Sequence, residues 1–119
     1  MPGHPLHTLV TTLRRRPGVE AALVVSVDGL VISQEAADGV AVEALAAQAP
    51  RLLAPAAAVG TLAGRGPLQL AFLDHETGSL VLAPLSDEAA LLVVTSPACD
   101  RAGLVSDLRR HRLHLVALA

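Results

Sequence analysis

The densest group of side chains capable of acid–base or metal chemistry is the tripeptide Asp74-His75-Glu76. These residues open the segment 74–79, in which Asp, Thr, Gly and Ser are typical of a hairpin connection. Solvent at a hairpin tip prevents the desolvation that tunes catalytic pKa values. We therefore interpret all three as turn residues, with neither a hydrolytic nor a metal-binding role.

Two pairs of histidines have helical spacing, His4 with His7 and His111 with His114. Residues three apart lie on one face of a helix, and imidazole is a good ligand for zinc, copper and nickel. Four imidazoles would meet at one metal if the two terminal helices lay side by side. The pattern offers no third ligand type and no carboxylate to orient the rings, so we predict no metal site.

The remaining patterns for bond-making chemistry are missing or weak. Cys99 is the single cysteine, which excludes an intrachain disulfide and a cysteine zinc site. It falls at a predicted helix start, where the dipole would lower its pKa, yet a lone cysteine is more often a small packed residue. The chain contains no lysine and no Gly-x-Ser-x-Gly motif, which excludes P-loop, Schiff-base and serine-elbow chemistry. We expect no catalytic residue and no cofactor.

The composition is that of one folded domain, expected to span residues 1–119. A hydrophobic fraction of 52% against 17% charged residues excludes intrinsic disorder. The longest uncharged stretch, 52–64, contains Pro55 and Gly60 and is shorter than the roughly 20 residues of a membrane span. With no secretory signal pattern at the N-terminus, we expect a soluble, cytoplasmic protein.

Charge and aromatic content argue against nucleic-acid partners. The net charge is −2 with neutral histidines, whereas non-specific binding to nucleic acid needs a basic surplus. Phe72 is the only aromatic residue, so stacking platforms for single strands are not available.

Helical periodicity predicts three helices, at 4–15, 40–62 and 99–112. Pro17-Gly18 ends the first, and Asp38 is the expected N-cap of the second. Pro50 and Pro55 interrupt the second helix, so we expect a kink or break near Ala49. The stripe expected to face the core there is Val42, Leu45, Ala49, Leu52, Leu53, Ala56 and Val59. The opposite face carries Ala46, Ala47, Ala54 and Ala57, which indicates either helix propensity or a smooth docking surface.

Five strands are predicted, at 19–27, 30–34, 68–73, 80–85 and 89–95. Asp28-Gly29 favours a type I′ turn between the first two strands. Short connections make the last three strands antiparallel neighbours, and Pro84 indicates a strand end or an edge position. The order is helix, two strands, helix, three strands, helix, which predicts an α+β sandwich around one antiparallel sheet.

Several segments together resemble roadblock (dynein light chain) domains. Pro17-Gly18-Val19-Glu20, the strand 22–26 and the stretch 28–32 resemble the opening hairpin of that family, and 78–85 with 89–94 resemble its later strands. The order of elements also matches, over nearly the whole chain. The resemblance implies a roadblock/profilin-like sandwich, with a five-stranded antiparallel sheet and helices on both faces. It also implies a homodimer, or a heterodimer with a sister subunit, in which strand 68–73 pairs with its mate. The seam would include Leu68, Leu70 and Phe72.

Members of this family bind small Ras-like GTPases, and the bacterial MglB-like members stimulate GTP hydrolysis without donating a catalytic residue. The resemblance therefore implies a homodimeric, non-enzymatic regulator of such a GTPase. The partner surface would lie on the second helix, whose Pro50 and Pro55 depart from the long helix of the family. Its residues would be Glu43, Ala46, Ala47, Pro50 and Arg51. An alternative is a dimeric scaffold subunit of a signalling assembly with no effect on GTP hydrolysis. A third interpretation is a small-molecule sensor or enzyme on the same sandwich, which would need an apolar pocket with convergent polar groups.

Overall fold

The computed structural model describes residues 5–111 and 114. The described residues form one sheet and three helices in the order that the sequence predicts, which confirms the α+β class. In chain order the elements are α1 (Pro5–Arg14), β1 (Val19–Ser26), β2 (Val31–Ala36), α2 (Val42–Leu62), β3 (Ala71–His75), β4 (Gly78–Pro84), β5 (Ala89–Thr95) and α3 (Arg101–Arg110).

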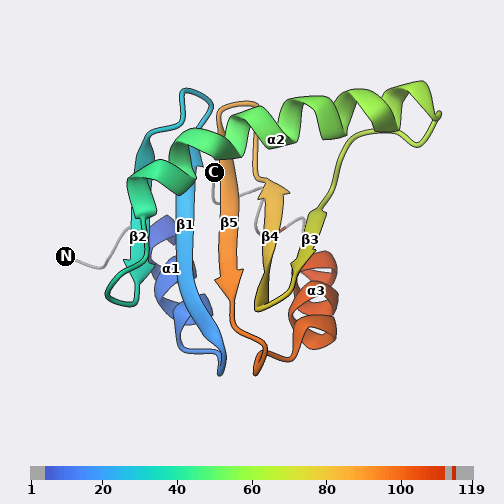
Figure 1. Ribbon diagram of the computed structural model, residues 1–119. Coiled ribbons are helices and arrows are strands. Elements are labelled where there is room, and N and C mark those ends of the chain that lie inside the picture. Colours follow the sequence, from blue (N-terminus) through green and yellow to red (C-terminus); the bar gives the residue numbers. More distant parts are fainter. Residues whose placement is uncertain (1–4, 112–113, 115–119) are drawn as a thin grey trace.

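The sheet has the strand order β2-β1-β5-β4-β3, and every neighbouring pair is antiparallel. α1 and α3 cover one face, and α2 crosses the other face near one end of the strands (Figure 1). Strand residues alternate between the two faces, so the sheet supports two separate apolar clusters. On β1, Ala22 and Val24 face α1, whereas Leu23 and Val25 face α2.

α2 is one continuous helix through both prolines, so of the kink or break expected near Ala49 the break is wrong. An interior proline removes a backbone hydrogen bond and costs about 3 kcal/mol. Ala46 and Ala49 are buried against the sheet before Pro50, and Leu53 packs on the same cluster after it. These contacts with the sheet, before and after Pro50, keep the helix continuous where the proline removes a backbone hydrogen bond.

The burial of α2 also differs from the expected stripe. Leu52 is 43% exposed and Val59 64% exposed, although periodicity assigned both to the core. Ala46, assigned to the outer face, is fully buried. Small side chains let the helix approach the sheet closely, and that approach, rather than residue hydrophobicity, decides which side of α2 faces inward. The helix begins after Ala41, which makes no side-chain capping bond, so Asp38 is not the N-cap.

The β1–β2 turn is not of type I′, which requires positive φ at both central residues. No described residue other than glycine has positive φ, and Gly29 does, at +81°. Gly29 N donates to Ser26 O and Ser26 N donates to Leu30 O, which closes a three-residue loop of a type I turn followed by glycine. A Cβ on Gly29 would lie 3.0 Å from Cα of Ala47, so both the turn and the close approach of α2 require glycine.

β3 begins three residues later than the predicted strand 68–73. It pairs with β4 in a register that places Ala71 opposite Leu82 and His75 opposite Gly78. This register leaves Glu76 and Thr77 as the turn. Asp74 and His75 are therefore strand residues and not turn residues, and Leu68 and Leu70 precede the strand.

Candidate partner-binding surface

α2 offers an apolar surface that the described chain does not cover. In this helix of 21 residues, all of them described, only Ala46 and Ala49 are buried. Its last turns reach past the edge of the sheet (Figure 1). Beyond Leu52 and Val59, Leu62 near the helix end is 88% exposed. Large apolar side chains gathered in this way on one element are typical of an interaction surface.

The sheet beside α2 continues this surface. Leu73, Leu80 and Val94 lie opposite one another on β3, β4 and β5, and each is partly exposed on the face that α2 crosses. α2 passes over one end of the strands, so this row lacks the cover that α1 and α3 give to the other face (Figure 1). Sequence reasoning missed Leu73 and Leu80 as surface residues, because alternation along a strand does not reveal whether a helix covers each face.

β3 is an edge strand, hydrogen-bonded within the described chain to β4. Of the residues expected at a dimer seam, Phe72 is 40% exposed, with the Arg101 guanidinium carbon 6.0 Å from its ring centroid. Leu70 packs against the cluster under α1 and α3, and Leu68 lines a groove beside α2. An unpaired edge with an exposed aromatic ring is available for pairing with another strand.

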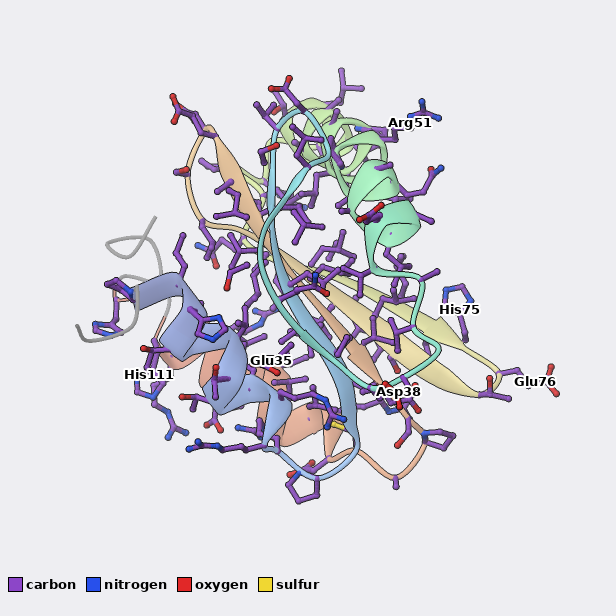
Figure 2. The ribbon with its side chains drawn as sticks, turned by 90° about the vertical axis from the view of Figure 1, so that its left-hand side faces the viewer. Glu35, Asp38, Arg51, His75, Glu76 and His111 are labelled. Atoms are coloured by element: carbon purple, nitrogen blue, oxygen red, sulfur yellow. The ribbon has the colours of Figure 1, made fainter. Side chains whose placement is uncertain are left out.

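The residues expected at a partner surface divide into two groups. Glu43, Ala47 and Arg51 follow one another at intervals of four and are exposed, so they form one outward stripe. Arg51 extends from α2 away from the sheet (Figure 2). Pro50 is half-buried beside the stripe, and the buried Ala46 side chain faces the sheet and contributes no exposed atoms.

The acidic cluster Asp74-His75-Glu76 is split by the structure. Asp74 forms an ion pair with Arg101, whose guanidinium also donates to Ser79 Oγ at 3.1 Å. This contact ties the first turn of α3 to the β3–β4 hairpin. His75 and Glu76 are exposed at the far end of that hairpin (Figure 2). Asp74 is therefore a structural anchor in the described chain.

The histidines lie on separate parts of the molecule. His7 Nδ1 is 3.0 Å from Ser33 Oγ, and its Nε2 is 3.7 Å from a Glu35 carboxylate oxygen, which places it beside β2. His111 and His114 line a groove of about 580 Å³ between α1 and α3. His4 lies outside the described residues. Among the residues that are described, no three His, Cys, Asp or Glu side chains come together in a group able to hold a metal ion.

Cys99 is buried in the apolar cluster below α1 and α3, which confirms it as a small packed residue. Burial raises the pKa of its thiol above the ordinary value, and the nearby Arg16 lowers it only in part. A helix dipole lowers a thiol pKa only when the thiol is exposed at the first turn. α3 instead begins after Asp100, whose carboxylate accepts from Gly103 N at 3.1 Å.

Across 5–111 and 114, none of the helices combines the length and apolar character needed to cross a membrane.

A comparison with curated protein sequences found no match. Solved structures with the same fold include MglB in a tetrameric arrangement, which is 18% identical and aligns over 100% of this chain and 93% of that one, with a TM-score of 0.83.

Two further structures extend the comparison. The gliding protein MglB of Thermus thermophilus is 19% identical over 100% of this chain and 93% of its own, with a TM-score of 0.82. A Roadblock/LC7 domain from Streptomyces avermitilis is 28% identical over 98% of this chain and 100% of its own, with a TM-score of 0.57. Residues 6–95 match the Roadblock/LC7 domain family, which confirms the resemblance in the hairpins. The chain belongs to the Roadblock/LC7 domain family.

Proposed function

We propose that this chain is a homodimeric, non-enzymatic regulator that binds a small Ras-like GTPase. The observation that carries the proposal is the set of exposed apolar side chains on α2, Leu52, Val59 and Leu62, together with the partly exposed row on β3, β4 and β5. The family resemblance supplies the class of partner, and the MglB structures share the fold.

Dimerisation through this surface would cover the part of the sheet that α2 leaves open. A second copy would pair its β3 with the free edge of β3 and lay its own α2 over Leu73, Leu80 and Val94. Both the unpaired edge and the exposed apolar side chains would then be removed from water, and each of these is unfavourable when left open. An isologous interface of this kind is the commonest arrangement of homodimers.

GTPase binding would then use the stripe of Glu43, Ala47 and Arg51 with the adjoining Pro50. The stripe places a negative and a positive side chain on either side of a small one, eight residues apart. Alanine between the two charges lets a partner surface approach the helix backbone, and the flanking charges set its orientation.

The direct test mixes the chain with the Ras-like GTPase of the same genome, loaded with GDP or with a GTP analogue, on size exclusion with light scattering. We expect the chain alone to elute at twice the 12.2 kDa of one copy, and to co-elute with the GTP-analogue form. A hydrolysis assay on that complex then separates a regulator from a scaffold. Binding without any change in the hydrolysis rate would favour the scaffold alternative.

Two matched pairs of variants locate the surfaces. Val59→Glu should convert the dimer to a monomer, whereas Thr61→Glu, on another side of the same exposed turn, should not. Ala47→Arg should abolish GTPase binding and leave the dimer intact, whereas Thr77→Arg, in the β3–β4 turn, should leave both unchanged. All four positions are exposed, so the fold tolerates the substitutions. Full GTPase binding by Ala47→Arg would remove this stripe from consideration.

A further inference from the structure

A groove of about 520 Å³ lies between one flank of α2 and the end of the sheet. α2 contributes four side chains at positions i, i+3, i+4 and i+7, which share one side of a helix. They are Pro50, Leu53, Ala54 and Ala57. The facing wall consists of the loop before β3 and the adjacent strand ends, with Val25, Val27, Pro67, Leu68, Pro84, Leu85, Ala89 and Ala90. The groove is therefore apolar except for Ser26, Ser86 and Asp87 at one end.

One end of the groove is acidic. The β1–β2 and β4–β5 turns lie side by side there, since Val27 N donates to Glu88 O at 3.0 Å. Asp87 lines the groove, and Asp28 and Glu88 are exposed in the same two turns. None of these three carboxylates takes part in an ion pair with any described residue. Val27, 59% exposed, adds apolar surface between the charges.

This groove is largely separate from the surface assigned to the dimer; of the three residues expected at the seam, Leu68 alone lines it. Leu52 and Val59, seven residues apart on α2, are exposed but do not line it. The uncovered row of Leu73, Leu80 and Val94 does not line it either. A dimer through those residues would leave the groove open. Pro50 and Ala54, which follows Arg51 by three residues, lie both beside the outward stripe and in the groove wall.

The lining favours a helix over a small molecule. Sites for small ligands combine an apolar pocket with several convergent polar groups, and here the polar lining is Ser26, Ser86 and Asp87, all at one end. The wall from Pro50 to Ala57 is about 10 Å long at the helical rise, which matches two turns of a second helix. An amphipathic helix binds by laying its apolar face into a hydrophobic groove, and charges at one end of the groove favour a partner of opposite charge there.

We propose that this groove binds an amphipathic helix of a partner protein, with leucine-like side chains along the groove and basic side chains against Asp28, Asp87 and Glu88. Arg65, in the loop after α2, lies outside this acidic end and places a positive charge near the end of α2. The helix is therefore oriented with its basic end at the two turns. The proposal does not depend on GTPase binding, because the groove and its charges belong to the folded chain itself.

The test uses two synthetic peptides of about 14 residues, long enough to become helical on binding. Both carry the same amphipathic leucine pattern, one with lysine and the other with glutamate at every polar position. Fluorescence anisotropy with the full chain should show the lysine peptide binding roughly tenfold or more tightly than the glutamate peptide, because like charges oppose docking. The difference should shrink as salt is added, since the carboxylates are exposed.

Matched variants separate the groove from general attraction to an acidic protein. The double variant Asp87→Asn with Glu88→Gln should weaken the lysine peptide roughly fivefold, while Asp38→Asn with Glu76→Gln removes the same charge elsewhere and should have no effect. Ala54→Lys, in the groove wall, should abolish binding, whereas Ala58→Lys, one turn on and outside the groove, should not. Circular dichroism confirms that each variant is folded. Equal binding of both peptides, or full binding by the folded Ala54→Lys variant, overturns the proposal.

Discussion

The two faces of the sheet are built to different degrees of completeness. On one face α1 and α3 together bury a cluster that includes fully covered leucines such as Leu91 and Leu104. On the other face α2 covers one end of the strands, where Leu23, Leu82 and Leu92 are also buried, whereas the row of Leu73, Leu80 and Val94 stays partly exposed (Figure 1). The first face is covered along its length within the described chain, and the second keeps an open apolar row.

Under the proposed function, this difference places association on the incompletely covered face of the sheet. Strand alternation supplies apolar side chains to both faces almost equally, because β1, β4 and β5 are apolar at consecutive positions. What distinguishes the faces is the helix above each one. Substitutions of buried residues on the closed face should therefore change unfolding, whereas substitutions at the exposed positions of the open face should change assembly.

The largest expected effect is on the closed face. Leu104→Ala removes a fully buried side chain of α3 and leaves a cavity, which costs about 2–5 kcal/mol of unfolding free energy. Leu62→Ala, at an 88% exposed position, should change it by less than about 0.5 kcal/mol. Urea unfolding at two protein concentrations checks both values. A comparable loss in the two variants would contradict the division between the faces.

The second prediction compares the two edge strands. Phe72→Glu on β3 should weaken dimerisation by roughly tenfold or more, because two copies of the charge would meet across a two-fold seam. Ile32→Glu makes a similar change on β2, where Ile32 is 49% exposed, and should leave the dimer intact. Light scattering over a dilution series measures both. If Ile32→Glu dissociated the dimer and Phe72→Glu did not, the seam would lie on β2, and the prediction would be wrong.

A smaller effect is expected at the start of α3. The Asp100 carboxylate accepts from Gly103 N at 3.1 Å and caps the helix. Asp100→Ala should reduce the unfolding free energy by about 1 kcal/mol, and Asp100→Ser should restore most of it. Dimer formation should be unchanged in both, because this cap lies on the closed face. Thermal unfolding with light scattering on the same samples tests the two statements together.

The smallest effect is a pH dependence on the closed face. Arg16 donates to Asp107 at 2.7 Å, and this hydrogen bond holds the pKa of the Asp107 carboxyl below its ordinary value. A lowered folded-state pKa stabilises the fold at pH values above the unfolded-state pKa, about 4 for Asp. This contribution to the free energy of unfolding is lost as pH falls through the folded-state pKa. Asp107→Asn should therefore be slightly less stable than the parent at pH 7. The two proteins should converge in acid, and a gap that persists there would refute this assignment.

The hairpins were largely predictable, because glycine and turn residues act locally. Val19 and Thr95 mark strand ends that sequence and structure share. The predicted strand 68–73 was displaced because Leu68 and Leu70 are apolar and look strand-like, whereas register with β4 selects Ala71–His75. Register is a relation between two strands, so a single segment does not reveal it.

The exposure of the expected partner stripe was predictable in part. An alanine-rich second helix indicated either helix propensity or a docking surface, and Glu43, Ala47 and Arg51 are exposed. The sequence assigned Leu52 to the core and Ala46 to the outer face, whereas Leu52 is exposed and Ala46 is buried. The assignment was wrong because this helix has apolar or small residues on nearly every side. Periodicity cannot then choose the inward face.

The sequence by itself determined the class of fold, the order of elements, and the absence of lysine-based chemistry and of an intrachain disulfide. Each of these follows from residue types or from short-range spacing that any conformation of the chain retains. The family came from the resemblance of its hairpin segments to roadblock domains, which the family match over residues 6–95 confirms. Only the tertiary structure decided which side of α2 meets the sheet, that the helix continues through Pro50 and Pro55, and which sheet face stays open. Those outcomes depend on how closely a helix can approach a sheet, which is a property of two surfaces in contact and not of either one in isolation.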